Sequence, residues 1–309
     1  MTHERIPARF EALDPRFAGI GGDRELRVLF DDGRWLEGPA YSPQGRFLLF
    51  SDIPNDRVLR YDEVSGAVHT WDARAGFTNG RTVDREGRFV QCEHGGRRVV
   101  RFEHDGSASV VADSYQGRRL NSPNDVVVHT DGSVWFTDPH YGIRNDYEGH
   151  RGDEEIGSRN VYRWSEDDGL VAASDALDGP NGLAFSPDGA FLYVSDSEHR
   201  SIVRFPVEGA RLGEGSTFAT ADVIYDGLRI DTEGRVWAAA EDGVHVYHPD
   251  GEQLGRLAVP QVVSNLEFGG PQRNLLYLTA TSRLYVLRVT VQGVSRMPSP
   301  SGAVRTAAR

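Results

Sequence analysis

Six side chains that carry an oxygen atom recur at one place in a repeated sequence pattern. Each stands eight residues before a turn position, which is a glycine in five repeats and Arg273 in the sixth. Carboxylate and amide oxygens are the ligands that a hard cation such as Ca²⁺ prefers, and the set contains no Cys or His. The pattern therefore predicts a site for an oxygen-coordinated divalent cation. The six residues are Glu37, Asn79, Asn124, Asn181, Asp226 and Asn265.

A simpler explanation is that Asn and Asp are common in turns, often directly before glycine. Asn79, Asn181 and Asp226 do precede a glycine. A turn preference does not require the same register six times, however, and it does not explain Glu37. If Glu37 and Asp226 converge, their charges repel each other unless a cation neutralises them.

Several other chemistries find no support in the chain. It contains no Lys, which excludes a Schiff-base lysine and a Walker-type phosphate loop. A zinc site would call for a Cys pair or an H-E-x-x-H motif, and neither occurs. A G-x-S-x-G nucleophile elbow is absent as well. Cys92, the single cysteine, is expected to be a small buried hydrophobic residue.

The elements that must position the six residues are short strands. Around Asn124, a polar loop leads into an apolar strand, a tight Asp131-Gly132 turn and a second strand, which is a strong hairpin signal. The turn positions follow one another at intervals of 39 to 57 residues, a spacing typical of propellers and arrays. They are Gly45, Gly87, Gly132, Gly189, Gly234 and Arg273.

Six such units predict an all-β fold, a six-bladed β-propeller with a metal site in its central channel. A helical repeat is excluded because the apolar residues alternate with period two. The strand over 25–30 is expected to complete the sixth blade and to close the ring. Because the first strand of a blade is innermost, the six residues would surround one end of the channel.

The propeller domain is expected to span 24–292, with a loose leader over 1–23 and a C-terminal tail over 293–309. Residues 139–158 form an insertion in the third unit. It is either a solvated loop or a lid beside the mouth of the channel, since long loops are often functional.

The net charge of −12 argues against nucleic acid or an anionic membrane as a partner. No apolar stretch is long enough for a membrane span, and the polar N-terminus is no signal peptide. We therefore expect a cytoplasmic protein, or a periplasmic one if an export signal is missing from the sequence. It is expected to be a monomer or a homodimer and to bind a small molecule.

Four segments resemble the SMP-30/gluconolactonase family, and its bacterial gluconolactonases in particular. The likeness spans roughly residues 10–290 and implies a six-bladed propeller with one divalent metal, usually Ca²⁺. The segments are Ser122-Pro-Asn-Asp-Val-Val-Val with Asp131-Gly-Ser-Val-Trp-Phe-Thr-Asp-Pro139, Pro180-Asn-Gly-Leu-Ala-Phe-Ser-Pro-Asp-Gly189, Cys92-Glu-His-Gly-Gly-Arg-Arg98 and Tyr225-Asp-Gly-Leu-Arg-Ile-Asp231.

The resemblance implies four metal ligands. The family's Glu before Gly-Pro falls on Glu37, its Asn in Pro-Asn-Gly on Asn181, and its Asp in Asp-Gly-Leu on Asp226. Asn124 matches an Asn that is a ligand in some members and a substrate contact in others. Animal members have a sugar-contacting Arg where this chain has Ser122, so the substrate contacts do not carry over as a set.

The remaining polar residues near the mouth are candidates for substrate contact. His94 could instead serve only to pack a loop, and the same alternative applies to His140 and Tyr141. A further group, Asp52, Asp138 and Asp196, ends the second strands at matching places and is expected to bond backbone amides. The predicted substrate-binding residues are Asn79, His94, Asn121, His140, Tyr141 and Asn265.

Together these features predict a Ca²⁺-dependent lactonase that opens sugar lactones to aldonic acids. The cation would polarise the lactone carbonyl, and the attacking water would be bound to the metal or deprotonated by Asp226 as general base. Two alternatives stay open. One is an organophosphate (phosphotriester) hydrolase that uses the same metal site, and the other is a non-catalytic ligand-binding propeller.

Overall fold

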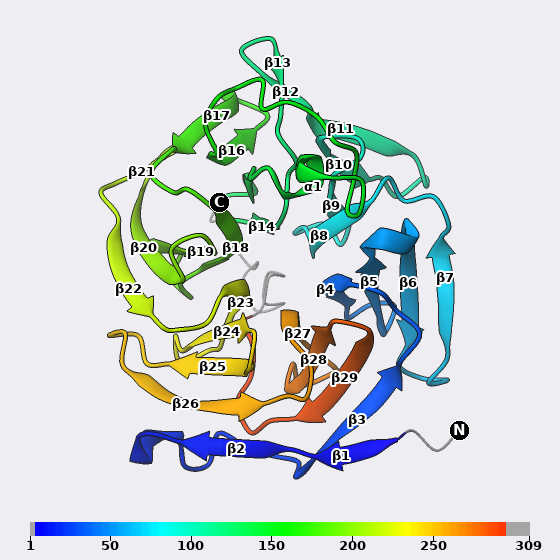
Figure 1. The fold of residues 1–309 in the computed structure, drawn as a ribbon, viewed down its shortest axis with the longest axis vertical. Coiled ribbons are helices and arrows are strands. Elements are labelled where there is room, and N and C mark those ends of the chain that lie inside the picture. Colours follow the sequence, from blue (N-terminus) through cyan, green and yellow to red (C-terminus); the bar gives the residue numbers. More distant parts are fainter. Residues whose placement is uncertain (1–3, 295–309) are drawn as a thin grey trace, which may run out of the picture.

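Six antiparallel sheets stand around a central axis in a computed structural model of the protein, which describes residues 4–294 (Figure 1). Each sheet is one blade. In the first four blades the first strand in chain order lies innermost, and in the last two blades N-terminal strands are added at the outer edge. The predicted six-bladed propeller is therefore confirmed. Among residues 4–294, no helix is both long and apolar enough to cross a membrane.

The first three blades each have four strands, which are named from the axis outward. Blade one contains β4 (Leu36–Ser42), β5 (Phe47–Asp52), β6 (Arg57–Asp62) and β7 (Val68–Asp72). Blade two contains β8 (Thr78–Val83), β9 (Phe89–Glu93), β10 (Arg98–Phe102) and β11 (Ala108–Ala112). Blade three contains β14 (Val126–Val128), β15 (Val134–Thr137), β16 (Val161–Ser165) and β17 (Gly169–Ser174).

The other three blades carry additional strands. Blade four contains β18 (Pro180–Phe185), β19 (Phe191–Asp196) and β20 (Ser201–Glu208), with β21 (Arg211–Leu212) and β22 (Ser216–Thr220) both paired to β20. Blade five contains β23 (Tyr225–Ile230), β24 (Val236–Ala240), β25 (Gly243–Tyr247), β26 (Gln253–Ala258) and β2 (Arg9–Ala12). Blade six contains β27 (Val263–Gly269), β28 (Leu275–Ala280), β29 (Arg283–Arg288), β3 (Glu25–Phe30) and β1 (Arg5–Pro7).

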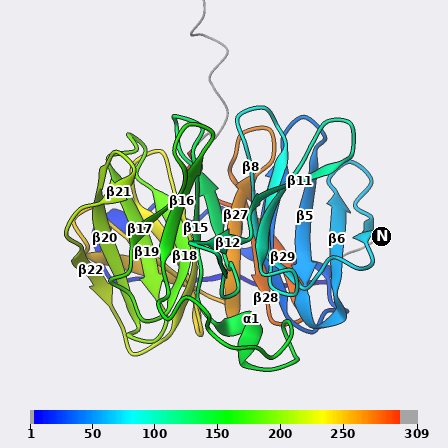
Figure 2. The same cartoon turned by 90° about the horizontal axis from the view of Figure 1, so that it is seen from above.

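Four short elements lie outside the blades. They are the hairpin of β12 (Ser114–Tyr115) and β13 (Arg118–Arg119), helix α1 (Tyr141–Arg144), and the 3₁₀ turns η1 (Pro15–Phe17) and η2 (Ile53–Asn55). Helix α1 belongs to the 139–158 insertion and projects from one face of the ring (Figure 2).

The second strand of each blade is largely buried because it packs between two neighbouring blades. Trp135 in β15 and Trp237 in β24 are completely buried. Such strands read as continuous apolar runs because neither face meets water. The apolar runs that revealed the repeat in the sequence are therefore strands packed between neighbouring blades.

The ring is closed by strands from both ends of the chain. As predicted, β3 pairs with β29, so the sixth blade joins the N-terminal and C-terminal parts. The pairing leaves no free edge between the first and last units. Of the predicted C-terminal tail, Gly293 bridges Asp231 and residues 295–309 lie outside the described residues.

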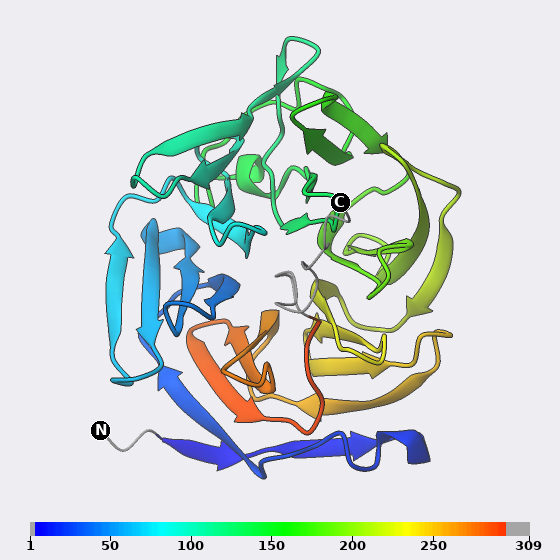
Figure 3. The ribbon, with the colours of Figure 1, turned by 180° about the vertical axis from the view of Figure 1, so that it is seen from behind.

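The expectation of a loose leader over 1–23 was wrong. Strand β1 pairs with β3, and β2 pairs with β26 on the outer edge of blade five (Figure 3). The polar sequence misled because an edge strand keeps one face in water. The inner faces of β1 and β2, which carry Ile6 and Phe10, pack against the core shared by blades five and six.

Phe17 allows a test of this N-terminal cover. It is 3% exposed and packs in the same core. We expect Phe17→Ala to lower the free energy of unfolding by about 3 kcal/mol, as for other buried phenylalanines. Urea denaturation measures the change. Leu13→Ala is the matched control because Leu13 is 66% exposed, and an equal loss in both variants would contradict the proposed packing.

Candidate metal centre and active site

Five of the six predicted ring residues line one cavity at the mouth of the central channel. The cavity has a volume of about 370 Å³. Asp226 is half-buried, and the other four are buried with their side chains at the cavity wall. The structure thus brings together Glu37, Asn79, Asn124, Asn181 and Asp226.

A backbone irregularity at the start of the inner strands helps to place these side chains. In five blades the register between the first and second strands shifts beside the ring residue, for example between Glu37 and Ala40. Such β-bulges bend a strand and re-aim a side chain. In blade three, Asn124 precedes the first residue of β14 instead.

The glycine after a ring residue allows neighbouring inner strands to approach closely. A Cβ atom on Gly38 would lie 2.1 Å from the backbone oxygen of Asn79, and one on Gly182 would lie 2.3 Å from that of Asp226. The glycines are therefore required by close packing around the axis. This is the physical reason for the Asn-Gly and Asp-Gly pairs in the sequence.

Hydroxyl groups tie ring residues to the preceding blade, a feature that sequence analysis missed. Ser51 donates to the backbone oxygen of Asn79 at 2.9 Å, and Thr137 donates to that of Asn181 at 2.7 Å. Ser195 donates in the same way to the backbone oxygen of Asp226 at 2.6 Å. A repeated Ser-Asp or Thr-Asp pair at the end of the second strand was the signal that could have revealed these inter-blade clasps.

The Asp of each pair has the structural role predicted for it. Asp52 accepts from the backbone N–H of Arg34 at 3.0 Å, and Asp138 accepts from that of Asn121 at 2.8 Å. Asp196 accepts from the backbone N–H of Gly179 at 3.0 Å. These bonds fix the loops that lead into the inner strands. Cys92 is fully buried in the core, as expected.

Asn265 differs from the other five ring residues because it does not line the cavity. It is buried outside the cavity lining, and its Nδ2 donates to Oε2 of Glu37 at 3.1 Å. The same carboxylate oxygen accepts from the backbone N–H of Gly38 at 2.6 Å. Asn265 therefore orients Glu37 and is not placed to touch a ligand directly.

The two ring carboxylates are electrostatically disfavoured without a counter-ion. Burial, together with the charge of Asp125, raises the pKa of Glu37 to about 8. Burial and the charge of Glu37 raise the pKa of Asp226 well above its ordinary value. Desolvation and like charge both disfavour ionisation, so a bound cation would relieve both groups.

The charges along the channel indicate the valence of that cation. Four carboxylates on or beside the inner strands and the two buried guanidinium groups of Arg81 and Arg229 leave a formal charge of −2 on full ionisation, and Glu148 of the 139–158 insertion adds one more negative charge to the cavity. Arg229 donates to Glu267 at 2.9 Å and lies 3.6 Å from Asp125. A divalent cation would offset most of this charge, so the residues fit such an ion. The carboxylates are Glu37, Asp125, Asp226 and Glu267.

The donor set also limits the kind of metal. Within residues 4–294, no three His, Cys, Asp or Glu side chains are grouped closely enough to hold a metal. The ring supplies two carboxylates, and its other donors are amide oxygens. Such a set suits Ca²⁺ and lacks the nitrogen and sulfur ligands that zinc favours.

The insertion over 139–158 lies over this cavity. Helix α1 and the residues after it supply part of the wall, including Tyr141, Arg144, Tyr147 and Glu148. Arg144 forms an ion pair with Glu198 from blade four, and its guanidinium lies 4.9 Å from the centre of the Tyr141 ring. Of the two expectations for this segment, the lid agrees with its position.

His94 is fully buried and lies outside the cavity lining, so it is not placed for the substrate contact predicted for it. Its Nδ1 lies 2.9 Å from the backbone oxygen of Glu148 in the lid, and its Nε2 lies 3.4 Å from Nδ2 of Asn79. Because a carbonyl only accepts, Nδ1 carries the proton and Nε2 accepts from Asn79. The amide oxygen of Asn79 is then left for the cavity. Burial lowers the pKa of His94 to about 4.

The remaining predicted substrate contacts are divided between the cavity and its supports. Tyr141 lines the cavity, and its hydroxyl donates to the backbone oxygen of Gly179 at 3.1 Å. His140 lies outside the lining and accepts from Nε of Arg144 at 2.6 Å. Asn121 is buried and donates to the backbone oxygens of Asp138 and Ser158, so it supports the loop.

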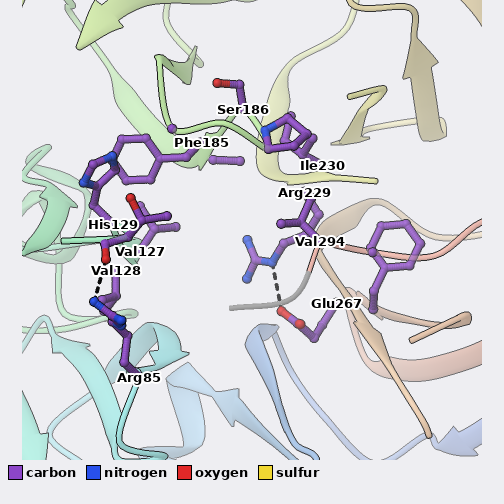
Figure 4. A pocket seen from close by; sticks show the side chains of 16 residues that line it. Arg85, Val127, Val128, His129, Phe185, Ser186, Arg229, Ile230, Glu267 and Val294 are labelled. Atoms are coloured by element: carbon purple, nitrogen blue, oxygen red, sulfur yellow. Dashed lines mark hydrogen bonds and ion pairs between the residues drawn. The ribbon is translucent and has the colours of Figure 1, made fainter. Parts of the chain in front are cut away.

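A second cavity of about 200 Å³ lies at the far ends of the inner strands (Figure 4). Its wall includes Phe185, Ile230 and Val294, with the Arg229–Glu267 pair at one side. The charged groups of that pair already neutralise each other. The cavity at the lid end, where Glu37 and Asp226 converge and neither forms an ion pair with the residues that the structure describes, is therefore the better candidate for chemistry.

Comparison with known proteins identifies the family of the chain. A family model described as SMP-30/gluconolactonase/LRE-like region matches residues 35–282. Gluconolactonase from Zymomonas mobilis is 31% identical over 295 residues, which cover 87% of this chain and 82% of that protein. A gluconolactonase structure from Xanthomonas campestris has a TM-score of 0.87 at 37% identity and covers 93% of this chain and 96% of its own. The regucalcin structure from Agrobacterium tumefaciens, described as a calcium-binding protein, shares the fold with a TM-score of 0.72 at 19% identity, covering 87% and 95%.

The raised pKa values predict how the stability of the cation-free protein depends on pH. Glu37 has a pKa of about 8 in the folded state, against an ordinary value of 4.5. The folded state then binds protons more tightly, so this stability is fully present below about pH 4.5 and is lost as the pH rises to about 8. With a chelator present, we expect the Tm to fall over this range, and we expect added Ca²⁺ to remove the fall.

Burial also raises the pKa of Glu148 and Asp138 to about 7, so these groups contribute to the same pH dependence. The variant Asp226→Asn separates the contribution of the ring carboxylates from theirs. The variant removes the Asp226 carboxyl, whose own pKa burial and the charge of Glu37 raise, and it keeps Glu148 and Asp138. Its chelated form should therefore lose less Tm between about pH 5 and pH 8 than the chelated wild type. Identical slopes by differential scanning calorimetry would refute the coupling of the two carboxylates.

Proposed function

The chain belongs to the SMP-30/gluconolactonase/LRE-like family, and from this premise we propose that it hydrolyses sugar lactones to aldonic acids with one bound divalent cation, which we take to be Ca²⁺. The observation that carries the proposal is the convergence of five oxygen-bearing side chains in one cavity of about 370 Å³. Glu37, Asn124, Asn181 and Asp226 would hold the ion. When bound, it would supply Lewis-acid polarisation of the lactone carbonyl and stabilise the developing oxyanion.

The cavity wall suits a small polyhydroxylated ring. Trp35, Tyr141 and Tyr147 offer flat apolar faces for the C–H groups of a sugar. Asn145, Ser197 and Glu198 add polar groups that can bond hydroxyls and fix its orientation. These residues come from the lid and from the loops around the mouth, so they are the proposed determinants of substrate choice.

Asn79 has a proposed role in binding the substrate. Its amide nitrogen faces Nε2 of His94, which leaves the amide oxygen to accept a hydrogen bond in the cavity. A lactone hydroxyl is a donor of the right kind. His94, Asn121, His140 and Asn265 would then act through the residues that they orient.

The test is an assay of lactone hydrolysis by Asp226→Asn, with the spontaneous rate subtracted. Loss of one of the two ring carboxylates should lower kcat/KM on an aldonolactone by at least about 100-fold, because the carbonyl loses its electrostatic stabilisation. Chelation should abolish wild-type activity, and Ca²⁺ should restore it.

Asp222→Asn is the matched control for this assay. Asp222 lies near Asp226 in the chain but is exposed and outside the cavity lining. The control makes the same chemical change and leaves the cavity intact, so its rate should equal that of the wild type.

Three results would contradict the proposal. The first is a near-normal lactonase rate in Asp226→Asn, and the second is wild-type activity that a chelator leaves unchanged. The third is faster turnover of a phosphotriester than of any aldonolactone in the same panel, which would favour a phosphotriester hydrolase on the same site.

A further inference from the structure

We propose that Glu148 is the acid–base residue of lactone opening, carried over the metal site by the lid. The inference rests on the proposed function and adds to it the group that moves the proton. Glu148 belongs to the 139–158 insertion and lines the same cavity as Glu37 and Asp226.

The position of Glu148 separates it from the metal ligands. Glu148 comes from the 139–158 insertion, whereas Glu37 and Asp226 come from the inner strands β4 and β23, and the three do not form a group that could share an ion among residues 4–294. Within residues 4–294 its carboxylate forms no hydrogen bond or ion pair. It is half-buried and faces the space where a substrate would lie above the ring.

The backbone that carries Glu148 is firmly held. Its carbonyl oxygen accepts from Nδ1 of His94 at 2.9 Å. The next residue packs so closely that a Cβ atom on Gly149 would lie 2.2 Å from the backbone oxygen of Gly142. Gly142 in turn lies directly on the His94 ring. A buried histidine thus fixes the loop, and the loop points its carboxylate into the cavity.

The other titratable groups at the cavity are committed elsewhere. Asp226 would hold the cation, which withdraws charge from the carboxylate and makes it a poor base. Glu198 is paired with Arg144, and the hydroxyl of Tyr141 already donates to Gly179. Among the carboxyl groups that line the cavity, Glu148 is neither a proposed metal ligand nor part of an ion pair with a described residue.

The electrostatic surroundings support the assignment. Burial raises the pKa of Glu148 to about 7, while Arg144 acts in the opposite direction. Glu37 and Asp226 face it across the cavity, and neutral His94 lies behind its backbone. Both protonation states are then accessible near neutral pH, as a group needs when it accepts a proton and later returns it.

The proton balance of the reaction is complete with this one residue. Water attacks the lactone carbonyl carbon, a C–O bond forms, and the water proton passes to the Glu148 carboxylate. The carbonyl then re-forms as the bond from its carbon to the ring oxygen breaks. Glu148 returns the proton to that oxygen, which becomes the free hydroxyl of the aldonic acid.

Glu148→Gln tests the inference, because the amide keeps the shape of the side chain and cannot take up the proton. We expect kcat on an aldonolactone to fall by about 100-fold or more, with little change in KM. The acidic limb of the kcat–pH profile should disappear. The affinity for Ca²⁺, measured by isothermal titration calorimetry, should equal that of the wild type.

Asp153→Asn is the matched control, since it removes one carboxylate from the same insertion at an exposed position outside the cavity. It should keep the wild-type rate and pH profile. A wild-type rate in Glu148→Gln would overturn the inference and leave the proposed function standing. A loss of Ca²⁺ affinity in that variant would make Glu148 a ligand and overturn it as well. A wild type that opens no lactone would overturn both.

Discussion

The repulsion between Glu37 and Asp226 at the mouth of the channel is the interaction on which the rest of the structure depends. Two carboxylates in a site of low dielectric cannot both ionise at ordinary pH without a counter-ion. Burial raises the pKa of both groups in the cation-free chain, and the charge of Glu37 adds to the rise for Asp226. A divalent cation of the kind proposed would allow both carboxylates to ionise.

Holding such a ring requires that neighbouring blades keep their positions. The hydroxyls of Ser51, Thr137 and Ser195 each bond the backbone of a ring residue in the next blade, so the clasps run around the axis. The pairing of β3 with β29 closes the same ring on its outside. The cavity is therefore a property of the closed propeller, because each of the four proposed ligands comes from a different blade or from the loop that leads into it.

Much of this arrangement could be predicted because it repeats. The register of Glu37, Asn124, Asn181 and Asp226 relative to the turns was enough to place them together. The predictions that were wrong concerned features that depend on contacts between segments far apart in the sequence. Strands β1 and β2 form because blades six and five offer open edges, and His94 is buried because the lid lies on it. The position of Glu148 could not be predicted, because it belongs to no sequence repeat and depends on how the irregular 139–158 insertion folds over the ring.

The site thus has two parts with different origins. The ring is built by the repeat, and its chemistry follows from the donors that the propeller gathers at the axis. The lid is particular to the third unit, and one residue shows how it changes the site. Ser122 occupies the position of the sugar-contacting Arg of animal members, and in this chain its hydroxyl donates to the backbone oxygen of Pro139 and accepts from the backbone N–H of Gly142. The position that contacts the sugar in those members therefore anchors the lid in this chain.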